Sequence, residues 1–234
     1  MKFLIGVLAA ALLAQTGGKL EIKDVEEGKG PAAKPGDILT MDYTGTLTNG
    51  KQFDSSVGKK PFTFILGAGQ VIKGWDQGMV GLKENGKRQL TIPSDLAYGK
   101  SGAGDDIPPD ATLKFDVKLI KLDRIESKIL VEGKGDGAVG GDSCEVNYIL
   151  TDADGKKIDS SYDRNQTLPV TIGRSQLITG FTAGLMGMKQ GEKRKITIPY
   201  QFAYGEKGRP PVIAPKATLF FEIEMVKLMH GAAK

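Results

Sequence analysis

The stretch PFTFILGAGQVIKGWDQGM, residues 61–79, runs an alternating apolar segment into a glycine turn and then into a short helical pattern. It carries Trp75, the single tryptophan of the chain. A second copy, LPVTIGRSQLITGFTAGL, occupies residues 168–185 and has Phe181 in place of the tryptophan. Because a repeated stretch indicates a repeated structural unit, the sequence predicts two versions of one fold.

The repeat extends beyond this stretch, and its register can be followed residue by residue. Tyr43 and Tyr148 lie 105 residues apart, whereas Tyr98 and Tyr204 lie 106 apart. One extra residue therefore enters the second copy, in the loop between residues 159 and 168.

The link between the copies is short. The first copy closes with an apolar strand pattern ending at Leu122, and the second begins at Glu126. So few residues cannot act as a free tether, and we expect the two units to hold a limited range of orientations. The predicted division is a leader in residues 1–18, a first domain in residues 19–123 and a second domain in residues 124–234.

Residues 3–14 form an uncharged apolar run that follows Lys2 and precedes small and polar residues. This layout is typical of a secretory signal peptide. A permanent membrane anchor is a weaker interpretation because a spanning helix needs about 20 apolar residues. An N-terminal strand or buried helix is the other alternative. We predict an exported protein, which places it in the ER lumen, the periplasm or the extracellular space.

The composition excludes several kinds of site. The net charge of +4 arises from 32 basic and 28 acidic residues interspersed along the chain, which is not the footprint of a nucleic-acid-binding protein. Cys144 is the only cysteine and His230 the only histidine. Cysteine–histidine catalysis and histidine-based metal binding are therefore excluded, and we expect neither a metal nor a cofactor. Cys144 alternates with polar residues and is predicted to be a buried strand residue.

Two loops match binding motifs only in form. Residues 135–140, GDGAVG, fit a dinucleotide-binding pattern, but a strand-like segment follows them where such a site requires a helix. Residues 152–159 begin like a calcium loop, yet lysines occupy its fifth and sixth positions. Both are predicted to be turns.

Within each copy the dominant hydrophobic period is two. Residues 39–43, 88–92 and 113–117 alternate apolar and polar side chains, which predicts half-buried antiparallel strands. The Asn49-Gly50 and Asp154-Gly155 pairs predict hairpin turns, because both residue types tolerate positive φ. Val71, Trp75 and Met79 are spaced at four and predict one helix, with Gly81 as its stop. One helix against one sheet gives an α+β fold.

An aromatic and apolar constellation with few acid–base groups recurs in this framework. Its segments are YTGTLTNGKQFDSS (43–56), residues 61–79, LTIPSDLAYG (90–99) and IPPDATLKFDVKL (107–119). In combination they resemble the FKBP-type peptidyl-prolyl cis-trans isomerases, the immunophilin class that binds macrolides such as rapamycin. The resemblance covers residues 20–122 in full and residues 126–228 more loosely. It implies two tandem FKBP-like domains, each a twisted antiparallel sheet wrapped around one short helix.

The resemblance also implies a pocket between sheet and helix, with Trp75 as its floor. The residues implied as catalytic are Tyr43, Asp54, Trp75, Tyr98 and Phe115, and those implied to bind substrate are Phe53, Phe62, Val71, Ile72 and Ile107. Taken singly, each of these has a plainer interpretation as core packing or turn capping. Only their joint match to one ordered pattern favours a site.

The second copy keeps part of this pattern and changes the rest. Its implied pocket residues are Tyr148, Asp159, Leu168, Leu177, Ile178, Phe181, Tyr204, Ile213 and Phe221. Phe181 offers less apolar area than tryptophan and lacks the indole donor. Arg164 and Arg209 occupy loops where the first copy has no arginine. Our hypothesis is that the first domain is the stronger catalyst and that the second is weaker or mainly recruits unfolded chains.

The implied activity is cis-trans isomerisation of Xaa-Pro bonds in exported proteins. The implied partners are proline-containing unfolded or nascent polypeptides and macrolide inhibitors of the rapamycin type. A non-catalytic proline-segment binding module or holdase is the main alternative, and a scaffold role is the third. Residues 100–106, KSGAGDD, are small and acidic where the family often carries a histidine and an apolar residue, which puts substrate scope and macrolide affinity in doubt more than catalysis.

Overall fold

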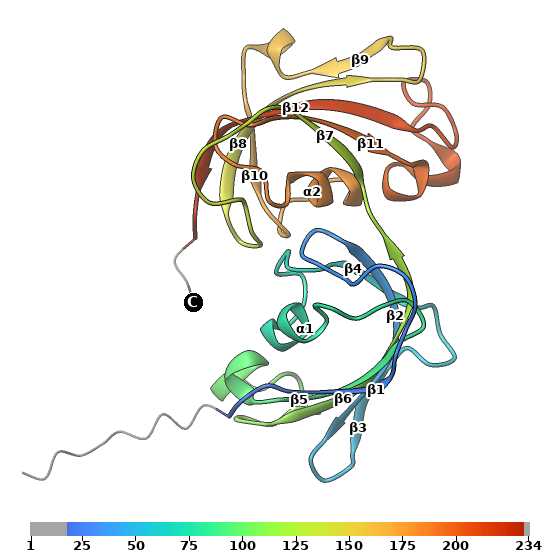
Figure 1. Ribbon diagram of the computed structural model, residues 1–234, viewed down its shortest axis with the longest axis vertical. Coiled ribbons are helices and arrows are strands. Elements are labelled where there is room, and N and C mark those ends of the chain that lie inside the picture. The colour runs from blue at the N-terminus through green and yellow to red at the C-terminus, as the bar shows by residue number, and fades with distance from the viewer. Residues whose placement is uncertain (1–17, 232–234) are drawn as a thin grey trace, which may run out of the picture.

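The computed structural model describes residues 18–231, so residues 1–17 of the predicted leader lie outside the described residues. Two antiparallel sheets of six strands each follow one another along the chain, and Figure 1 shows them stacked along its vertical axis. The α+β prediction is confirmed. No helix within residues 18–231 is long and apolar enough to cross a membrane.

The first sheet has the strand order β1-β5-β6-β2-β3, and β4 pairs with β2 beside it. Its elements are β1 (Glu21–Glu26), β2 (Ile38–Leu47), β3 (Gln52–Ser55), β4 (Phe62–Ile65), α1 (Lys73–Gly78), β5 (Lys87–Ile92) and β6 (Leu113–Asp123). Between β5 and β6 lie two short 3-10 turns, η1 (Ser94–Leu96) and η2 (Gly99–Ser101).

The second sheet repeats this arrangement, with the order β10-β8-β12-β11-β7 and β9 paired with β8. Its elements are β7 (Glu126–Val131), β8 (Ser143–Thr151), β9 (Lys157–Ser160), β10 (Leu168–Thr171), α2 (Thr179–Leu185), β11 (Lys193–Ile198) and β12 (Leu219–Met229). Its 3-10 turns are η3 (Tyr162–Arg164), η4 (Tyr200–Phe202) and η5 (Gly205–Lys207). Each strand of the second sheet thus pairs as its counterpart does in the first.

The two-residue period places one face of each strand in the core. In β6, Leu113 and Val117 are buried whereas Lys114 is exposed. Cys144 in β8 is 2% exposed, as its alternation with polar residues predicts. The hydrophobic pattern therefore identified the inward face of these strands correctly.

The helix of the first sheet is shorter than its four-residue spacing predicted. Val71 precedes α1, and Ile72 has an extended backbone with ψ of 148°. The helix lies directly against β5: a Cβ at Gly78 would meet Leu90 Cδ1 at 2.9 Å, and one at Gly74 would overlap Ile92. Only glycine permits so close an approach of the helix to the strand.

The predicted hairpins form, with a correction to their turn geometry. Gly50 and Gly155 have φ of 87° and 79°. Asn49 and Asp154 are not among the residues with positive φ, so only the glycine of each pair takes the left-handed conformation. Asp152 Oδ1 accepts hydrogen bonds from two backbone amides within the second hairpin, which confirms that this loop is a turn.

The two sheets are joined through the turn that follows β4. The backbone N–H of Gly140 donates to the carbonyl of Gly67 at 3.0 Å. Ala68 is fully buried and belongs to the same hydrophobic cluster as the core of the second sheet, together with Ile38 and Ile65. The first domain therefore contributes three side chains to the second core.

An ion pair fixes the link between β6 and β7. Arg124 Nε lies 2.7 Å from Asp37 Oδ1, and the Asp37 side chain is only 2% exposed. A second nitrogen of the same guanidinium donates to the carbonyl of Ala32 at 2.8 Å. Because a buried carboxylate requires a partner, this pair holds the first residue after β6 against the first domain.

Candidate functional site

The floor of the first candidate site is Trp75, which α1 presents toward the inner face of the sheet. Its ring centroid lies 5.2 Å from those of Tyr43 and Phe115, in edge-to-face geometry, and 6.0 Å from that of Phe62. Trp75 is 4% exposed. Its indole nitrogen is the one buried side-chain nitrogen or oxygen in the described part of the chain that lacks a hydrogen-bond partner.

The polar edge of this site is a tyrosine–aspartate pair on neighbouring strands. The Tyr43 hydroxyl in β2 donates a short hydrogen bond to Asp54 Oδ2 in β3, and the other Asp54 oxygen accepts the N–H of Ser55 at 2.8 Å. Burial, together with this carboxylate, raises the pKa of Tyr43 well above its ordinary value. Tyr43 therefore remains a neutral donor at physiological pH and holds the carboxylate in one orientation.

The remaining implied residues surround the same floor. Phe53 packs edge-to-face on Phe115 at 5.6 Å. Val71 and Ile72 are partly buried against the core cluster of the first domain, and Ile107 is a buried member of it. Tyr98 is 42% exposed and makes no hydrogen bond through its side chain within residues 18–231.

The sequence reasoning missed two contributors to this site. Phe64 is 2% exposed and packs against both Phe62 and Trp75 at 5.7 Å. Gly45 provides room for Phe53, because a Cβ there would lie 2.5 Å from the tip of that ring. The second copy has Leu150 at the glycine position and Ile158 at the Phe53 position. Gly45 and Phe53 thus change together between the two copies. Aligning the copies would have indicated from the sequence alone that these two positions are in contact.

The second candidate site is an open pocket of about 680 Å³ under the second sheet. Its floor, Phe181, lies 6.1 Å from Tyr148 and 5.0 Å from Phe221. The lining residues that the sequence predicted are Tyr148, Asp159, Leu168, Leu177, Ile178, Phe181, Tyr204 and Phe221, and those that it did not assign to the pocket are Leu150, Gln176, Thr179, Ala203 and Arg209. Ile213 is buried in the adjoining core rather than in the pocket lining.

An arginine clamps the tyrosine–aspartate pair of the second site. Arg164 Nη1 lies 2.5 Å from Asp159 Oδ1, and its Nη2 donates to the Tyr148 hydroxyl at 2.8 Å. Although burial acts to raise it, the hydrogen bonds from Arg164 and Tyr148 hold the pKa of Asp159 below its ordinary value. The first site has no such clamp, because its shorter loop between β3 and β4 carries no arginine.

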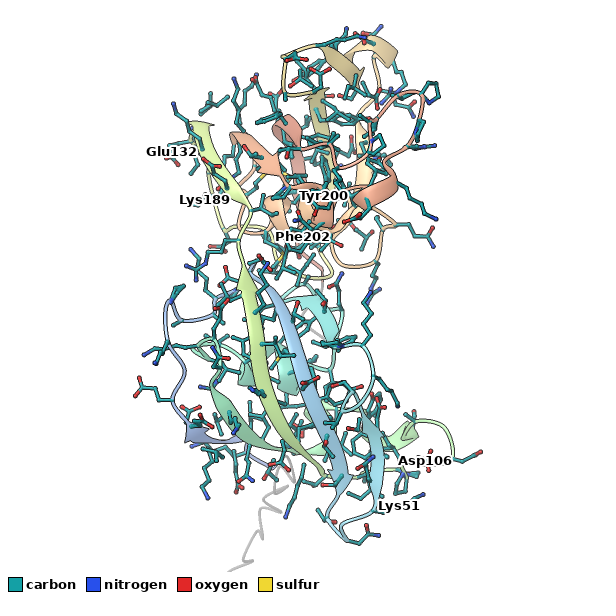
Figure 2. The ribbon with its side chains drawn as sticks, turned by 90° about the vertical axis from the view of Figure 1, so that its right-hand side faces the viewer. Lys51, Asp106, Glu132, Lys189, Tyr200 and Phe202 are labelled. Carbon is teal, nitrogen blue, oxygen red and sulfur yellow. The ribbon has the colours of Figure 1, made fainter. Side chains whose placement is uncertain are left out.

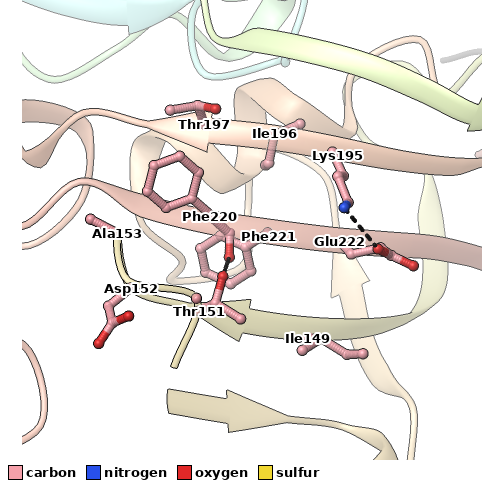
Figure 3. Close-up of a pocket in the computed structure, with 11 residues that line it drawn as sticks. Ile149, Thr151, Asp152, Ala153, Lys195, Ile196, Thr197, Phe220, Phe221 and Glu222 are labelled. Atoms are coloured by element: carbon pink, nitrogen blue, oxygen red, sulfur yellow. Dashed lines mark hydrogen bonds and ion pairs between the residues drawn. The ribbon is translucent and has the colours of Figure 1, made fainter. Parts of the chain in front are cut away.

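A separate groove of about 340 Å³ lies along β8, β11 and β12 of the second sheet (Figure 3). Thr151 Oγ1 donates to the carbonyl of Phe220, and Lys195 pairs with Glu222 at 3.7 Å. The groove contains neither the tyrosine–aspartate pair nor the aromatic floor. The tyrosine–aspartate pairs lie instead at the aromatic clusters beside the two helices.

Comparison with known proteins agrees with the repeat. A family model described as FKBP-type peptidyl-prolyl cis-trans isomerase matches residues 30–120 and again residues 135–226. The mouse protein named peptidyl-prolyl cis-trans isomerase FKBP10 is 40% identical over 219 residues, which cover 88% of this chain and 38% of that protein. The chain thus spans well under half the length of this relative.

Two further relatives match one domain-sized stretch. An FK506-binding protein of Neisseria meningitidis serogroup A is 56% identical over 106 residues, covering 45% of this chain and 97% of that protein. The crystal structure of FkpA from Escherichia coli is 45% identical with a TM-score of 0.42, and the match covers 45% of this chain and 48% of that one.

Proposed function

Because the chain belongs to the FKBP-type peptidyl-prolyl cis-trans isomerase family, we propose that it isomerises Xaa-Pro bonds in unfolded or nascent polypeptides. The observation that carries the proposal is the aromatic box around Trp75, edged by the paired Tyr43 and Asp54. The reaction makes and breaks no covalent bond, so it requires no nucleophile. The site instead needs to fit the proline ring, exclude water from the rotating bond and orient the substrate with a few polar groups.

The barrier to this rotation, about 18–20 kcal/mol, arises from the loss of amide resonance. The carbonyl of the twisted amide is less charge-separated than that of the planar amide. The twisted amide therefore loses less hydration free energy when it moves from water into the site. An apolar surface formed by the buried rings of Trp75 and Phe115 and the partly exposed ring of Phe62 therefore favours the twisted form over the ground state. The exposed Tyr98 hydroxyl, which has no partner in the described chain, is available to hold a substrate carbonyl in a turn that leads over the barrier.

We assign the stronger activity to the first domain. Four aromatic rings surround Trp75, belonging to Tyr43, Phe62, Phe64 and Phe115. Phe181 contacts only two, and its pocket is wide and open. A loosely walled pocket restricts a proline ring less and excludes less water, which favours binding over turnover.

The test is a matched pair of substitutions, Asp54→Asn and Asp159→Asn, in the full chain, assayed by protease-coupled or NMR exchange kinetics on an Xaa-Pro peptide. We expect Asp54→Asn to lower kcat/KM about tenfold through loss of orientation, and Asp159→Asn to lower it less than about twofold. Trp75 fluorescence verifies folding. Equal losses would contradict the dominance of the first domain, and no rate enhancement by the unsubstituted chain would favour a holdase.

The alternative function is a proline-segment binding module or holdase, and the open second pocket favours it for that domain. The proposed partners of the protein are proline-containing polypeptides and macrolides of the rapamycin type. We place the protein in an exported compartment on the strength of the leader pattern. We also propose that the domains divide between residues 123 and 124, next to the short link held by Arg124.

A further inference from the structure

The rim of the second pocket carries a cationic side chain that the first lacks. Arg209 lies in the loop between η5 and β12 and lines the pocket together with Tyr204 and Phe221. Its backbone N–H donates to the carbonyl of Ile213 at 2.8 Å, and the Ile213 N–H returns a bond to the Arg209 carbonyl at 3.0 Å. The Arg209 backbone is therefore held at the rim by a small antiparallel bridge.

The two arginines that distinguish the second copy differ in their electrostatic state. Arg164 is paired with Asp159, so its charge is compensated within the site. Arg209 has no ion pair or side-chain hydrogen bond within residues 18–231. The acidic residue on its own loop, Glu206, is paired with Lys216 at 3.3 Å. The pocket thus has one uncompensated positive charge at its rim.

The corresponding rim position of the first domain carries no charge. Ala103 occupies the position of Arg209 and forms the same backbone bridge, with Ile107. Nearby, Asp106 forms an ion pair with Lys51 at 2.8 Å, across to the β2–β3 hairpin (Figure 2). Its counterpart in the second copy is Val212. The cationic rim is therefore specific to the second pocket.

We propose that Arg209 makes the second pocket selective for Xaa-Pro segments that carry Asp or Glu beside the proline. The inference rests on the proposed function, since it assumes that this pocket receives such segments. A guanidinium facing a partly apolar cavity forms a charge-assisted hydrogen bond with a carboxylate. A neutral side chain at the same substrate position makes no equivalent contact, and a lysine is repelled.

The test uses the full chain with Asp54→Asn to reduce the contribution of the first pocket. Peptides of the form Ala-Xaa-Pro-Phe with Glu, Gln or Lys before the proline, and a matched set with these residues after it, are compared by kcat/KM. We expect Glu to exceed Gln by about two- to fivefold at low salt, the range of an exposed ion pair. The ratio should fall toward one as ionic strength rises.

Charge reversal separates recognition from a structural role. Arg209→Gln should abolish the preference, and Arg209→Glu should transfer it to the lysine peptides. Lys207→Gln on the same loop is the matched control, because Lys207 does not line the pocket, and it should leave the ratio unchanged. The inference would be overturned if the ratio of kcat/KM for Glu and Gln peptides were the same with and without Arg209 in both peptide sets.

Binding of the same peptides, followed by NMR shifts of residues around Phe181, distinguishes this inference from the proposed catalysis. Tighter binding of the Glu peptides without rate enhancement would refute turnover in the second pocket and support the role of Arg209. Turnover with no charge preference in rate or affinity would refute the role of Arg209 alone.

Discussion

Substitution of Gly173 by alanine tests whether the two domains form one cooperative body. Gly173 lies in the turn after β10, equivalent to the turn after β4 that meets it from the first domain. A Cβ at this position would overlap the carbonyl oxygen of Ala68 and lie 2.9 Å from its carbon. Relief of that overlap requires the turns to separate by about 1 Å.

Such a separation would break the hydrogen bond from Gly140 to Gly67, now 3.0 Å long, and loosen the burial of Ala68. The hydrogen bond contributes about 0.5–1.5 kcal/mol, and the buried methyl group about 0.8 kcal/mol. We therefore expect Gly173→Ala to lower the free energy of unfolding of the first domain by about 1–2 kcal/mol.

Trp75 is the only tryptophan and lies in the first domain, so its fluorescence during urea unfolding reports that domain alone. With an m-value of about 2 kcal/mol/M, the midpoint should fall by roughly 0.5–1 M. Gly135→Ala is the matched control: Gly135 also has positive φ, at 81°, but a Cβ there meets nothing within 4 Å. Equal Trp75 midpoints for the two variants would refute the coupling.

Two further outcomes follow from the titratable groups. Arg164→Met should raise the pKa of Asp159, measured by carboxyl NMR titration. A carboxylate with a depressed pKa stabilises the folded state, and this stability is lost as the pH falls through that pKa. The unsubstituted second domain should therefore lose more stability below about pH 4 than the variant. Identical titrations of Asp159 in the two proteins would contradict the role of Arg164. Burial, with a smaller contribution from Asp142, raises the pKa of Cys144 to about 11. At pH 8 its thiol should react with a disulfide reagent about a hundredfold more slowly than in the unfolded chain, and comparable rates would show that it is accessible.

Part of the first site could be predicted because its residues recur in an ordered pattern. Tyr43 and Trp75, 32 positions apart in the chain, were expected to share a pocket, and their rings lie 5.2 Å apart. Gly45 was not expected there, although a glycine within a strand often indicates the close approach of another group. Its role depends on the ring of Phe53 crossing β2, which no local pattern specifies.

The helix shows how local periodicity can mislead. Val71 fits the helical spacing, yet it lies in a bend before α1, and Ile72 after it has an extended backbone. The turn before α1 is held by Asp76, whose carboxylate accepts the N–H of Gly67 at 2.7 Å and that of Gly69 at 3.1 Å. Apolar spacing identified the helix, and the turn held by Asp76 precedes its first residue.

The sequence by itself determined two copies of a sheet-and-helix unit and the inward face of the strands, whereas the aromatic floor at Trp75 was expected only from the resemblance to a known family. These features depend on short-range alternation and on a repeated pattern, both of which are written along the chain. Only the tertiary structure decided that Arg164 is paired while Arg209 is not, and that Ala68 belongs to the core of the other domain. The burial of Ala68 depends on the approach of two turns that are remote in sequence, and the state of each arginine depends on which side chains lie within hydrogen-bond distance of it.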